Sequence, residues 1–446
     1  MRFGTDGIRG VANTELTAEF ALTLGRAAAR VLGGAKFLIG RDTRRSGPFL
    51  EAALAAGVCA EGVDVELLGV LPTPAVAVLS ALDGRPAAMI SASHNQFADN
   101  GIKLFAAGGT KLGDETQAQL ESEMERIRAV GSASDAPSGA DVGTIGHVEG
   151  SATRRYEASV LDAIEGRSLD GLHVVLDCAN GSNSDVAPEV FRRTGASVTV
   201  IGDRPNGVNI NEECGSTHPG RLQSTVIQVG AHMGFAFDGD ADRVLAVDAG
   251  GSLIDGDQLI AICARDLLDR GRLRHGAVAV TVMSNLGFHT GMGRAGIEVI
   301  ETQVGDRYVL EALDQYDLSL GGEQSGHLIF RDLTTTGDGL LSSVLVADLV
   351  SRQGRGLGEL ANEAMRRLPQ VLQNVRLTHR PDDLLERIAD QVRTAEAELG
   401  GTGRVLIRSS GTEPVVRVMV EAPDAGVAER LAETLCEAIA RAADAG

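Results

Sequence analysis

The chain has 446 residues, a formal net charge of −20 at pH 7 and no tryptophan. A chain of this length is expected to fold into about two to four domains rather than around one core. Its negative charge disfavours nucleic acid and anionic membranes as partners, although arginines gathered in a cleft can still bind a small anion. Aromatic residues make up only 3% of the sequence, which argues against base stacking on nucleic acid.

The cysteines and the first residues of the chain point to a cytoplasmic protein. The five cysteines are widely spaced and form no Cys-x-x-Cys pair, a pattern that predicts reduced thiols. The N-terminus has no apolar signal segment, and no apolar run is long enough to cross a membrane. We therefore expect a cytoplasmic location.

Short apolar runs alternate with amphipathic segments along the chain. Strands are expected at 37–39, 87–90, 174–176, 198–201, 234–237, 244–247, 278–283 and 328–330. Helices are expected at 18–31, 50–60, 115–127, 257–268 and 339–350. Strands that are apolar throughout, rather than at every second residue, indicate sheets covered by helices on both faces. The predicted fold class is therefore α/β.

Breaks in this pattern divide the chain into four predicted domains. Residues 131–143 are rich in Gly, Ser, Asp and Ala and are typical of a linker or surface loop. The run 249–252 again interrupts the series of strands and helices. Residues 366–368 are expected to be the basic end of a helix, because Pro369 follows them as a stop signal. The predicted ranges are 1–150, 151–252, 253–368 and 369–446.

Ser93 follows the apolar run 88–90 after two intervening residues and begins the sequence Ser-His-Asn. A serine hydroxyl can carry a phosphoryl group covalently, and ligand sites favour the carboxyl ends of strands. Ten residues later, Lys103 could hold the charge of a phosphoserine or move a proton. The alternative is an ordinary polar loop with a solvated lysine.

Three aspartates stand at alternate positions after an apolar run: Asp238, Asp240 and Asp242. Carboxylates this close repel one another unless a cation is present, and Mg²⁺ prefers hard oxygen ligands. A calcium-binding EF-hand loop is excluded because Arg243 and Ala249 stand where Gly and Glu are required. A second alternative is a phosphatase of the haloacid-dehalogenase type, but a member of that family would normally have Thr or Val at position 242 instead of Asp. The third alternative is an acidic surface turn.

Two further loops have the composition of a phosphosugar site. The run 321–327 combines glycines with Glu323, Ser325 and His327, which could bond sugar hydroxyls, and a flexible hairpin is its alternative. A second loop offers arginine forks, hydroxyls and glycine amides to a phosphate that is bound but does not react. Its residues are Arg408, Ser409, Ser410, Gly411, Thr412 and Arg417. Further loop arginines lie in 4–10, including Arg9, and in 40–46.

The four motifs occur in a fixed order, and together they resemble the α-D-phosphohexomutases over essentially the whole chain. The resemblance implies four domains around a central cleft, the first three mixed-sheet α/β units and the last a smaller α+β unit. The runs 2–10, 214–217, 304–308 and 321–327 are most similar to members that interconvert glucosamine 6-phosphate and glucosamine 1-phosphate for amino-sugar nucleotide and cell-wall precursor synthesis. Members acting on mannose or glucose phosphates, and a catalytically silent sugar-phosphate sensor, remain alternatives.

The resemblance also implies a role for each site residue. Ser93 would be the phosphoserine, and one Mg²⁺ would be held by its phosphoryl oxygen with Asp238, Asp240 and Asp242. Lys103 and Arg243 would lie beside the transferring group, and Arg9 and His327 would assist proton transfer. Glu323, Ser325 and His327 would contact the sugar, and the non-reacting phosphate would be held by Arg408, Ser409, Ser410, Gly411, Thr412 and Arg417.

The implied reaction passes through a bisphosphorylated hexose, which also serves as primer. The implied partner is a phosphosugar, with no nucleic acid or membrane, and a homodimer is left open. The unit after Pro369 would act as a lid that carries the phosphate-binding loop.

Two positions depart from the pattern of the family. Gln96 stands where a proline usually follows Ser-His-Asn, and Ser182 stands where an alanine usually follows Gly181. Loss of the proline removes a fixed φ angle and could loosen the loop of Ser93. Neither position carries a reacting group, so activity remains the expectation.

Overall fold

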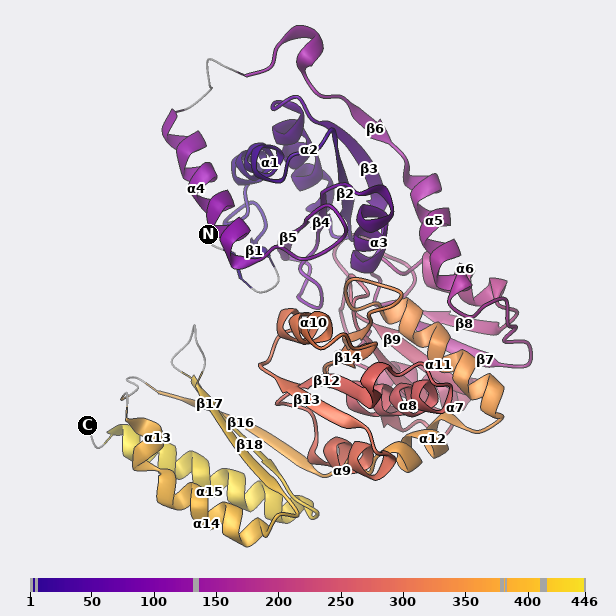
Figure 1. The fold of residues 1–446 in the computed structure, drawn as a ribbon, viewed down its shortest axis with the longest axis vertical. Coiled ribbons are helices and arrows are strands. Elements are labelled where there is room, and N and C mark those ends of the chain that lie inside the picture. Colours follow the sequence, from indigo (N-terminus) through magenta and orange to yellow (C-terminus); the bar gives the residue numbers. More distant parts are fainter. Residues whose placement is uncertain are drawn as a thin grey trace. The chain divides into compact units, whose positions relative to one another are not determined.

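The computed structural model describes residues 3–4, 7–130, 136–377, 381, 383–409 and 415–444. The chain forms two compact units, each of which is described by itself (Figure 1). The first comprises Met1–Met283 and Ile297–Ala361, and the second comprises Ser284–Gly296 and Asn362–Gly446. The described residues form four sheets.

The first sheet has the strand order β1-β5-β4-β2-β3-β6. Its strands are β1 (Ile8–Val11), β2 (Lys36–Arg41), β3 (Asp64–Val70), β4 (Ala87–Ile90), β5 (Asp99–Phe105) and β6 (Ile145–His147). The accompanying helices are α1 (Ala18–Leu32), α2 (Gly47–Cys59), α3 (Thr73–Asp83), α4 (Asp114–Val130) and α5 (Glu149–Asp162). Strands β2 and β4 are parallel neighbours, so the segments that follow them leave the sheet at the same edge.

The second sheet has the order β11-β10-β9-β7-β8 and contains the aspartate loop. Its elements are β7 (His173–Asp177), α6 (Val186–Arg193), β8 (Ser197–Ile201), α7 (Gly220–Val229), β9 (Met233–Phe237), β10 (Val244–Asp248) and β11 (Leu253–Ile254). Strands β9 and β10 pair antiparallel with Phe237 opposite Val244. Residues 238–243 therefore form a tight connection at the end of a fully buried strand.

The third sheet has the order β13-β12-β14-β15, with β12 parallel to both neighbours and β14 antiparallel to β15. Its strands are β12 (Ala277–Thr281), β13 (Glu298–Thr302), β14 (Leu320–Gly322) and β15 (Leu328–Phe330). The helices of this part of the chain are α8 (Gly256–Asp269), α9 (Leu286–Ala295), α10 (Asp306–Gln315), α11 (Gly339–Gln353) and α12 (Leu357–Ala364). Residues 323–327 form the loop of the β14–β15 hairpin.

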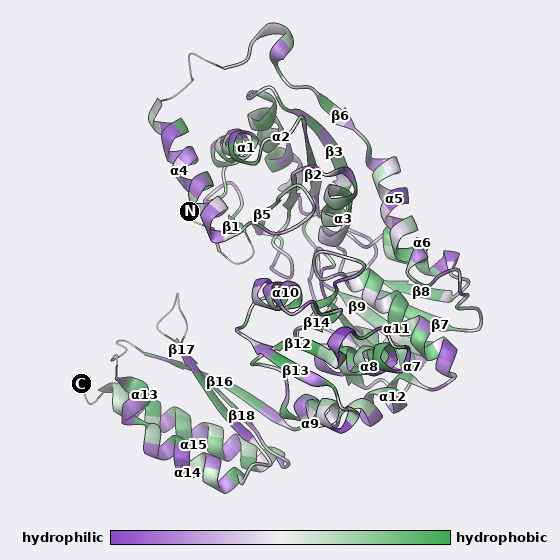
Figure 2. Ribbon diagram, viewed as in Figure 1, coloured by the Kyte–Doolittle hydropathy of each residue, from purple (hydrophilic) through white to green (hydrophobic). Residues whose placement is uncertain are grey.

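The fourth sheet is antiparallel throughout and lies in the second unit. It consists of β16 (Gln370–Arg376), β18 (Val415–Glu421) and β17 (Arg404–Ser409), with helices α13 (Leu384–Arg387), α14 (Ala389–Leu399) and α15 (Ala425–Asp444). Figure 2 shows apolar and polar residues alternating along α14 and α15. The apolar face of α15, with Leu431 and Leu435, packs in one core with Val416, Val418 and Val420 of β18, because only that face is apolar.

The predicted fold class is confirmed: three mixed α/β sheets are followed by a small antiparallel sheet with helices. Each expected strand and helix is present, with ends shifted by a few residues. The prediction of a helix end at 366–368 is wrong, because α12 ends at Ala364. Within the predicted linker, 139–141 form a short 3-10 helix, while 131–135 lie outside the described residues. The four domain ranges stay a prediction.

Among the described residues, no helix combines the length and the apolar character that crossing a membrane requires. The five cysteines are free thiols.

Candidate active site

Ser93 lies in the loop after β4, in direct contact with the aspartate loop. Its side-chain Oγ donates a hydrogen bond of 2.6 Å to Oδ2 of Asp238, although 145 residues separate the two in sequence. The Ser93 N–H donates to the hydroxyl of Ser91 at 3.0 Å. The residue is 1% exposed and has a φ of 53°, a left-handed conformation that a non-glycine residue keeps only when its surroundings fix it.

The three aspartates form a buried cluster whose ligand atoms all lie within 4.8 Å of one another. Oδ2 of Asp240 accepts from the Thr73 hydroxyl at 2.6 Å and from the Lys103 ammonium at 2.7 Å. Oδ1 of Asp240 is buried and has no hydrogen-bond partner among the described residues. Burial, followed by the charges of Asp242 and Asp240, raises the pKa of Asp238 well above its usual range. Hard oxygen atoms, one of them without a partner, fit a divalent cation such as Mg²⁺.

Lys103 is the buried counter-ion of this cluster. It lies on β5 with 3% of its surface exposed. Its ammonium group contacts Asp240 at 2.7 Å and Asp242 at 3.1 Å. The positive charge of Lys103 therefore offsets part of the repulsion among the carboxylates.

His94 lies beside Ser93, and Arg243 lies against the aspartates. The backbone N–H of Arg243 donates to Oδ1 of Asp238 at 3.2 Å, and its Nε lies 3.9 Å from Oδ1 of Asp242. Nδ1 of His94 lies 3.3 Å from the Ser93 hydroxyl. Burial, and then the charges of Arg243 and Arg9, lower the pKa of His94, which favours the uncharged imidazole. His94 was not among the predicted site residues, although its position next to Ser93 in the sequence could have identified it as one.

The three predicted sugar contacts of the hairpin loop 323–327 differ in burial: Glu323 is half-buried, His327 is buried and Ser325 is exposed. Burial raises the pKa of Glu323, and its Oε1 accepts from the Gly305 N–H at 3.2 Å. His327 is buried, and its Nε2 lies 3.3 Å from Oδ2 of Asp306, which also pairs with Lys111. Ser325 is exposed at the tip of the loop.

Lys111 could not be predicted as part of this cluster from the sequence, because no motif surrounds it. Its link to Asp306 depends on contacts between parts of the chain that lie 195 residues apart.

In the second unit, the register of two strands brings the predicted phosphate-binding arginines together. Arg408 on β17 is paired directly opposite Arg417 on β18. Like charges in directly opposed positions of a sheet repel each other, and an anion between them would relieve this repulsion. The side chain of Ser409 is not described, and Ser410, Gly411 and Thr412 lie outside the described residues.

The aspartate loop rests on the N-terminus of α11. The Gly339 N–H donates to the carbonyl of Ala241 at 3.0 Å. Asp338 is the N-cap of α11 and accepts from the Leu341 N–H at 2.9 Å, while the Tyr156 hydroxyl contacts both of its oxygens at 2.9 and 3.0 Å. Burial raises the pKa of Asp338 from 3.8 to about 6.

This pKa predicts a pH dependence of stability. An Asp whose pKa is higher in the folded state binds its proton more tightly there, so its contribution to stability falls as pH rises from about 4 to about 6. Asp338→Asn keeps an acceptor for Leu341 and Tyr156 but cannot ionise. Relative to wild type, the variant should gain up to about 3 kcal/mol of unfolding free energy between pH 4 and pH 7.

Urea unfolding of both proteins across this pH range measures the difference. A difference that does not change with pH would contradict the raised pKa of Asp338.

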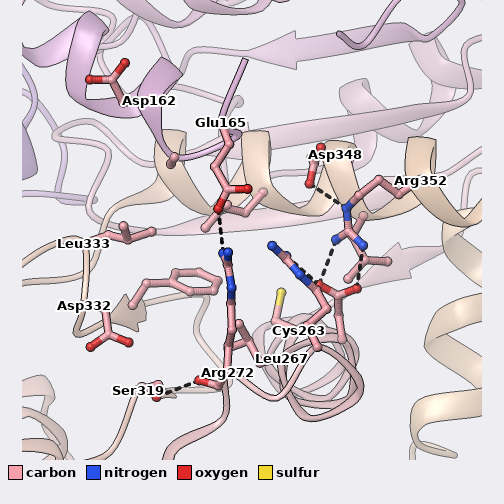
Figure 3. Close-up of a pocket in the computed structure, with 16 residues that line it drawn as sticks. Asp162, Glu165, Cys263, Leu267, Arg272, Ser319, Asp332, Leu333, Asp348 and Arg352 are labelled. Carbon is pink, nitrogen blue, oxygen red and sulfur yellow. Dashed lines mark hydrogen bonds and ion pairs between the residues drawn. The ribbon is translucent and has the colours of Figure 1, made fainter. Parts of the chain in front are cut away.

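A separate cavity of about 180 Å³ lies in the first unit, between α5, α8 and α11 (Figure 3). None of its lining residues belongs to the site around Ser93. Its arginines are paired with carboxylates: Arg272 contacts Glu165 at 2.7 Å, and Arg352 contacts both Asp266 and Asp348 at 2.8 Å. The pairs stabilise the walls of the cavity and leave these arginines engaged with the protein itself.

Family models match the chain in four consecutive segments. They describe phosphoglucomutase/phosphomannomutase alpha/beta/alpha domain I at 1–130, domain II at 154–251, domain III at 255–368 and the C-terminal domain at 372–438. The chain belongs to the phosphoglucomutase/phosphomannomutase family.

Within that family, relatives that match over nearly their full length include phosphoglucosamine mutases. The enzyme of Rhodococcus opacus (strain B4) is 52% identical, over 98% of this chain and 99% of its own. That of Exiguobacterium sp. (strain ATCC BAA-1283 / AT1b) is 48% identical, over 98% and 97%. The resemblance that we found in the sequence is confirmed.

Solved structures agree with the fold. A phosphoglucomutase/phosphomannomutase family protein from Burkholderia thailandensis has a TM-score of 0.82 and 26% identity, with 99% of this chain and 97% of that chain covered. N-acetylphosphoglucosamine mutase from Aspergillus fumigatus, solved in complex with GlcNAc-6P and magnesium, has a TM-score of 0.68 and 18% identity, with 99% and 96% covered. At 18% identity, the second comparison supports the fold alone.

Proposed function

We propose that this protein is an isomerase that interconverts glucosamine 6-phosphate and glucosamine 1-phosphate through a phosphorylated Ser93. The observation that carries the proposal is the 2.6 Å contact between the Ser93 hydroxyl and a buried cluster of three aspartates. Relatives of about the same length and close to half identical in sequence carry the name phosphoglucosamine mutase. The free cysteines suit a cytoplasmic enzyme of this kind.

Asp238, Asp240 and Asp242 would hold a Mg²⁺ ion. The partnerless oxygen of Asp240 supports this assignment, and the Aspergillus fumigatus enzyme was solved with magnesium. When bound, Mg²⁺ supplies neutralising charge to the oxygens of the transferring phosphoryl group.

The side chains of the chain itself suit two successive phosphoryl transfers. A hydroxyl oxygen of the sugar phosphate attacks the phosphorus on Ser93, the bond from phosphorus to Oγ breaks, and the hydroxyl proton passes to a nearby base. The bisphosphorylated sugar then turns over, and its other phosphoryl group returns to Oγ of Ser93. Lys103 and Arg243 would hold the phosphoryl charge in line, and alignment of this kind is the main catalytic requirement. Arg9 and His327 are our candidates for proton transfer.

The imidazole of His94 also lies at a suitable distance from Oγ of Ser93. It could take the hydroxyl proton when the phosphoryl group returns to Ser93.

Substrate binding is assigned to the two other loops. Glu323, Ser325 and His327 would bond the sugar hydroxyls, and the raised pKa of Glu323 suits a group that exchanges hydrogen bonds with a neutral ligand. The opposed Arg408 and Arg417 would bind the phosphate that does not react, together with Ser409, Ser410, Gly411 and Thr412.

A coupled assay tests the proposal against its nearest alternative, a mutase for glucose or mannose phosphates. The 6-phosphates of glucosamine, glucose and mannose are compared at equal concentration with Mg²⁺ and a bisphosphorylated hexose as primer. We expect the highest kcat/KM for glucosamine 6-phosphate, and an intact mass that includes one phosphoryl group. A preference for glucose or mannose phosphate would favour the alternative, and a silent sensor would turn over none of them.

A further inference from the structure

The side chain of Arg44 is fully buried and uses all five of its N–H groups. Nε donates to Oδ2 of Asp42 at 2.8 Å. The other four N–H groups donate to backbone carbonyls of the loop that carries the nucleophile. These carbonyls belong to Ser93 and Asn95, both at 2.9 Å, to Asp99 at 3.0 Å, and to Gln96. One planar guanidinium group therefore fixes four points of the loop.

The strand order explains why Arg44 reaches this loop. Strands β2 and β4 are parallel neighbours, with Arg41 opposite Ile90, so the residues after each strand meet at one edge of the sheet. Asp42 connects the two segments, because it accepts from the Ser91 hydroxyl at 2.6 Å and from the Arg44 N–H at 2.9 Å. The Ser91 hydroxyl in turn accepts from the Ser93 N–H at 3.0 Å.

A second donor holds the same loop from the side of the aspartate cluster. The side-chain amide of Asn211 donates to the carbonyls of Ser93 and Asn95 at 2.9 and 3.0 Å. Gly239 packs against this point so closely that a Cβ atom there would lie 2.7 Å from the Ser93 carbonyl oxygen. The backbone of Ser93 is thus fixed by Arg44 and by Asn211 at once.

Stability alone does not account for a buried ion pair at this place. Burial raises the pKa of Asp42 even though the charge of Arg44 opposes that rise. A buried pair of this kind is often no more stable than an apolar replacement of the same size. What the pair does supply is a fixed geometry for four carbonyl groups.

We propose that Arg44, supported by Asp42 and Asn211, is the positioning residue of the nucleophile loop. It holds Ser93 in its left-handed conformation with Oγ on Asp238. Arg44 also holds the backbone carbonyl of Gln96. In relatives with proline at this position, the proline ring would fix the φ angle instead. The inference rests on the proposed function, since it concerns the same serine.

Arg44→Lys tests this role. Lysine keeps a positive charge beside Asp42, but a single ammonium group cannot bind four separated carbonyls. We expect kcat for glucosamine 6-phosphate to fall about 100-fold with KM nearly unchanged, since misplacement of a reacting group acts mainly on the chemical step. Amide hydrogen exchange of peptides covering 91–99 should become faster.

Arg26→Lys is the matched control. Arg26 is also an arginine with little exposure, and its Nε contacts Glu61 at 2.6 Å, away from the loop. Neither kcat nor the exchange of 91–99 should change in this variant. Gln96→Pro should also leave kcat unchanged, because Arg44 already fixes the loop, and a large gain in kcat would overturn the inference.

Asn211→Ala removes two other hydrogen bonds to the carbonyls of Ser93 and Asn95 without leaving a buried charge. It should give a smaller fall in kcat and faster exchange of the same peptides. Wild-type kcat and exchange in both Arg44→Lys and Asn211→Ala would overturn the inference, as would a fall in kcat that only follows the folded fraction measured by circular dichroism. If wild-type Ser93 accepts no phosphoryl group, the proposed function fails, while the exchange data still decide whether Arg44 holds the loop.

Discussion

Ser93→Ala is expected to abolish turnover of glucosamine 6-phosphate while leaving its binding intact. The variant lacks the oxygen that would carry the phosphoryl group, and loss of a covalent nucleophile lowers kcat by about 10⁴-fold or more. The fold should tolerate the change, because alanine is smaller and the loop is held through backbone carbonyls. The coupled assay measures kcat, intact mass reports the phosphoryl group, and calorimetry reports binding.

Ser343→Ala is the control for this experiment. Ser343 is equally buried, but its hydroxyl only bonds the Leu340 carbonyl within α11. This variant should keep both activity and phosphorylation. Substantial turnover by Ser93→Ala, or an unchanged phosphorylated mass, would remove Ser93 from its role as nucleophile.

Asp240→Asn should have the second largest effect. Asparagine keeps the size of the side chain and can still accept from Thr73, but it removes a negative charge from the cluster and leaves Lys103 with one carboxylate fewer. We expect kcat to fall by about 10²–10³-fold and the Mg²⁺ concentration that gives half-maximal rate to rise. Titration of activity with Mg²⁺ measures both changes.

Asp162→Asn, in an exposed position at the end of α5, is the matched control. It also removes one aspartate charge, so it corrects for the change in overall charge. A Mg²⁺ titration of Asp240→Asn that matches the titration of Asp162→Asn would count against the metal assignment.

The position of the candidate site's loops could be predicted where neighbours in sequence are also neighbours in space. Ser93 follows a strand that is apolar at every position and fully buried, and the three aspartates follow another such strand. A polar group that follows closely after a buried strand lies near the edge of a sheet, so the local sequence was sufficient to predict where both loops lie.

The parts that could not be predicted depend on which strands pair. Arg44 appeared in the sequence only as one of several loop arginines, because its partners lie about 50 residues away along the chain. The opposition of Arg408 and Arg417 depends in the same way on the register of β17 and β18. The prediction of a helix end at 366–368 was wrong for a different reason: a run of helix-compatible residues before a proline does not have to form a helix.

Lys103 bears on whether the protein needs a metal ion in order to fold. Three buried carboxylates with no cation nearby would oppose folding. The ammonium group of Lys103, held between Asp240 and Asp242, supplies a resident cation in the folded chain. An ion that binds to this cluster after folding would then be exchangeable rather than a structural element.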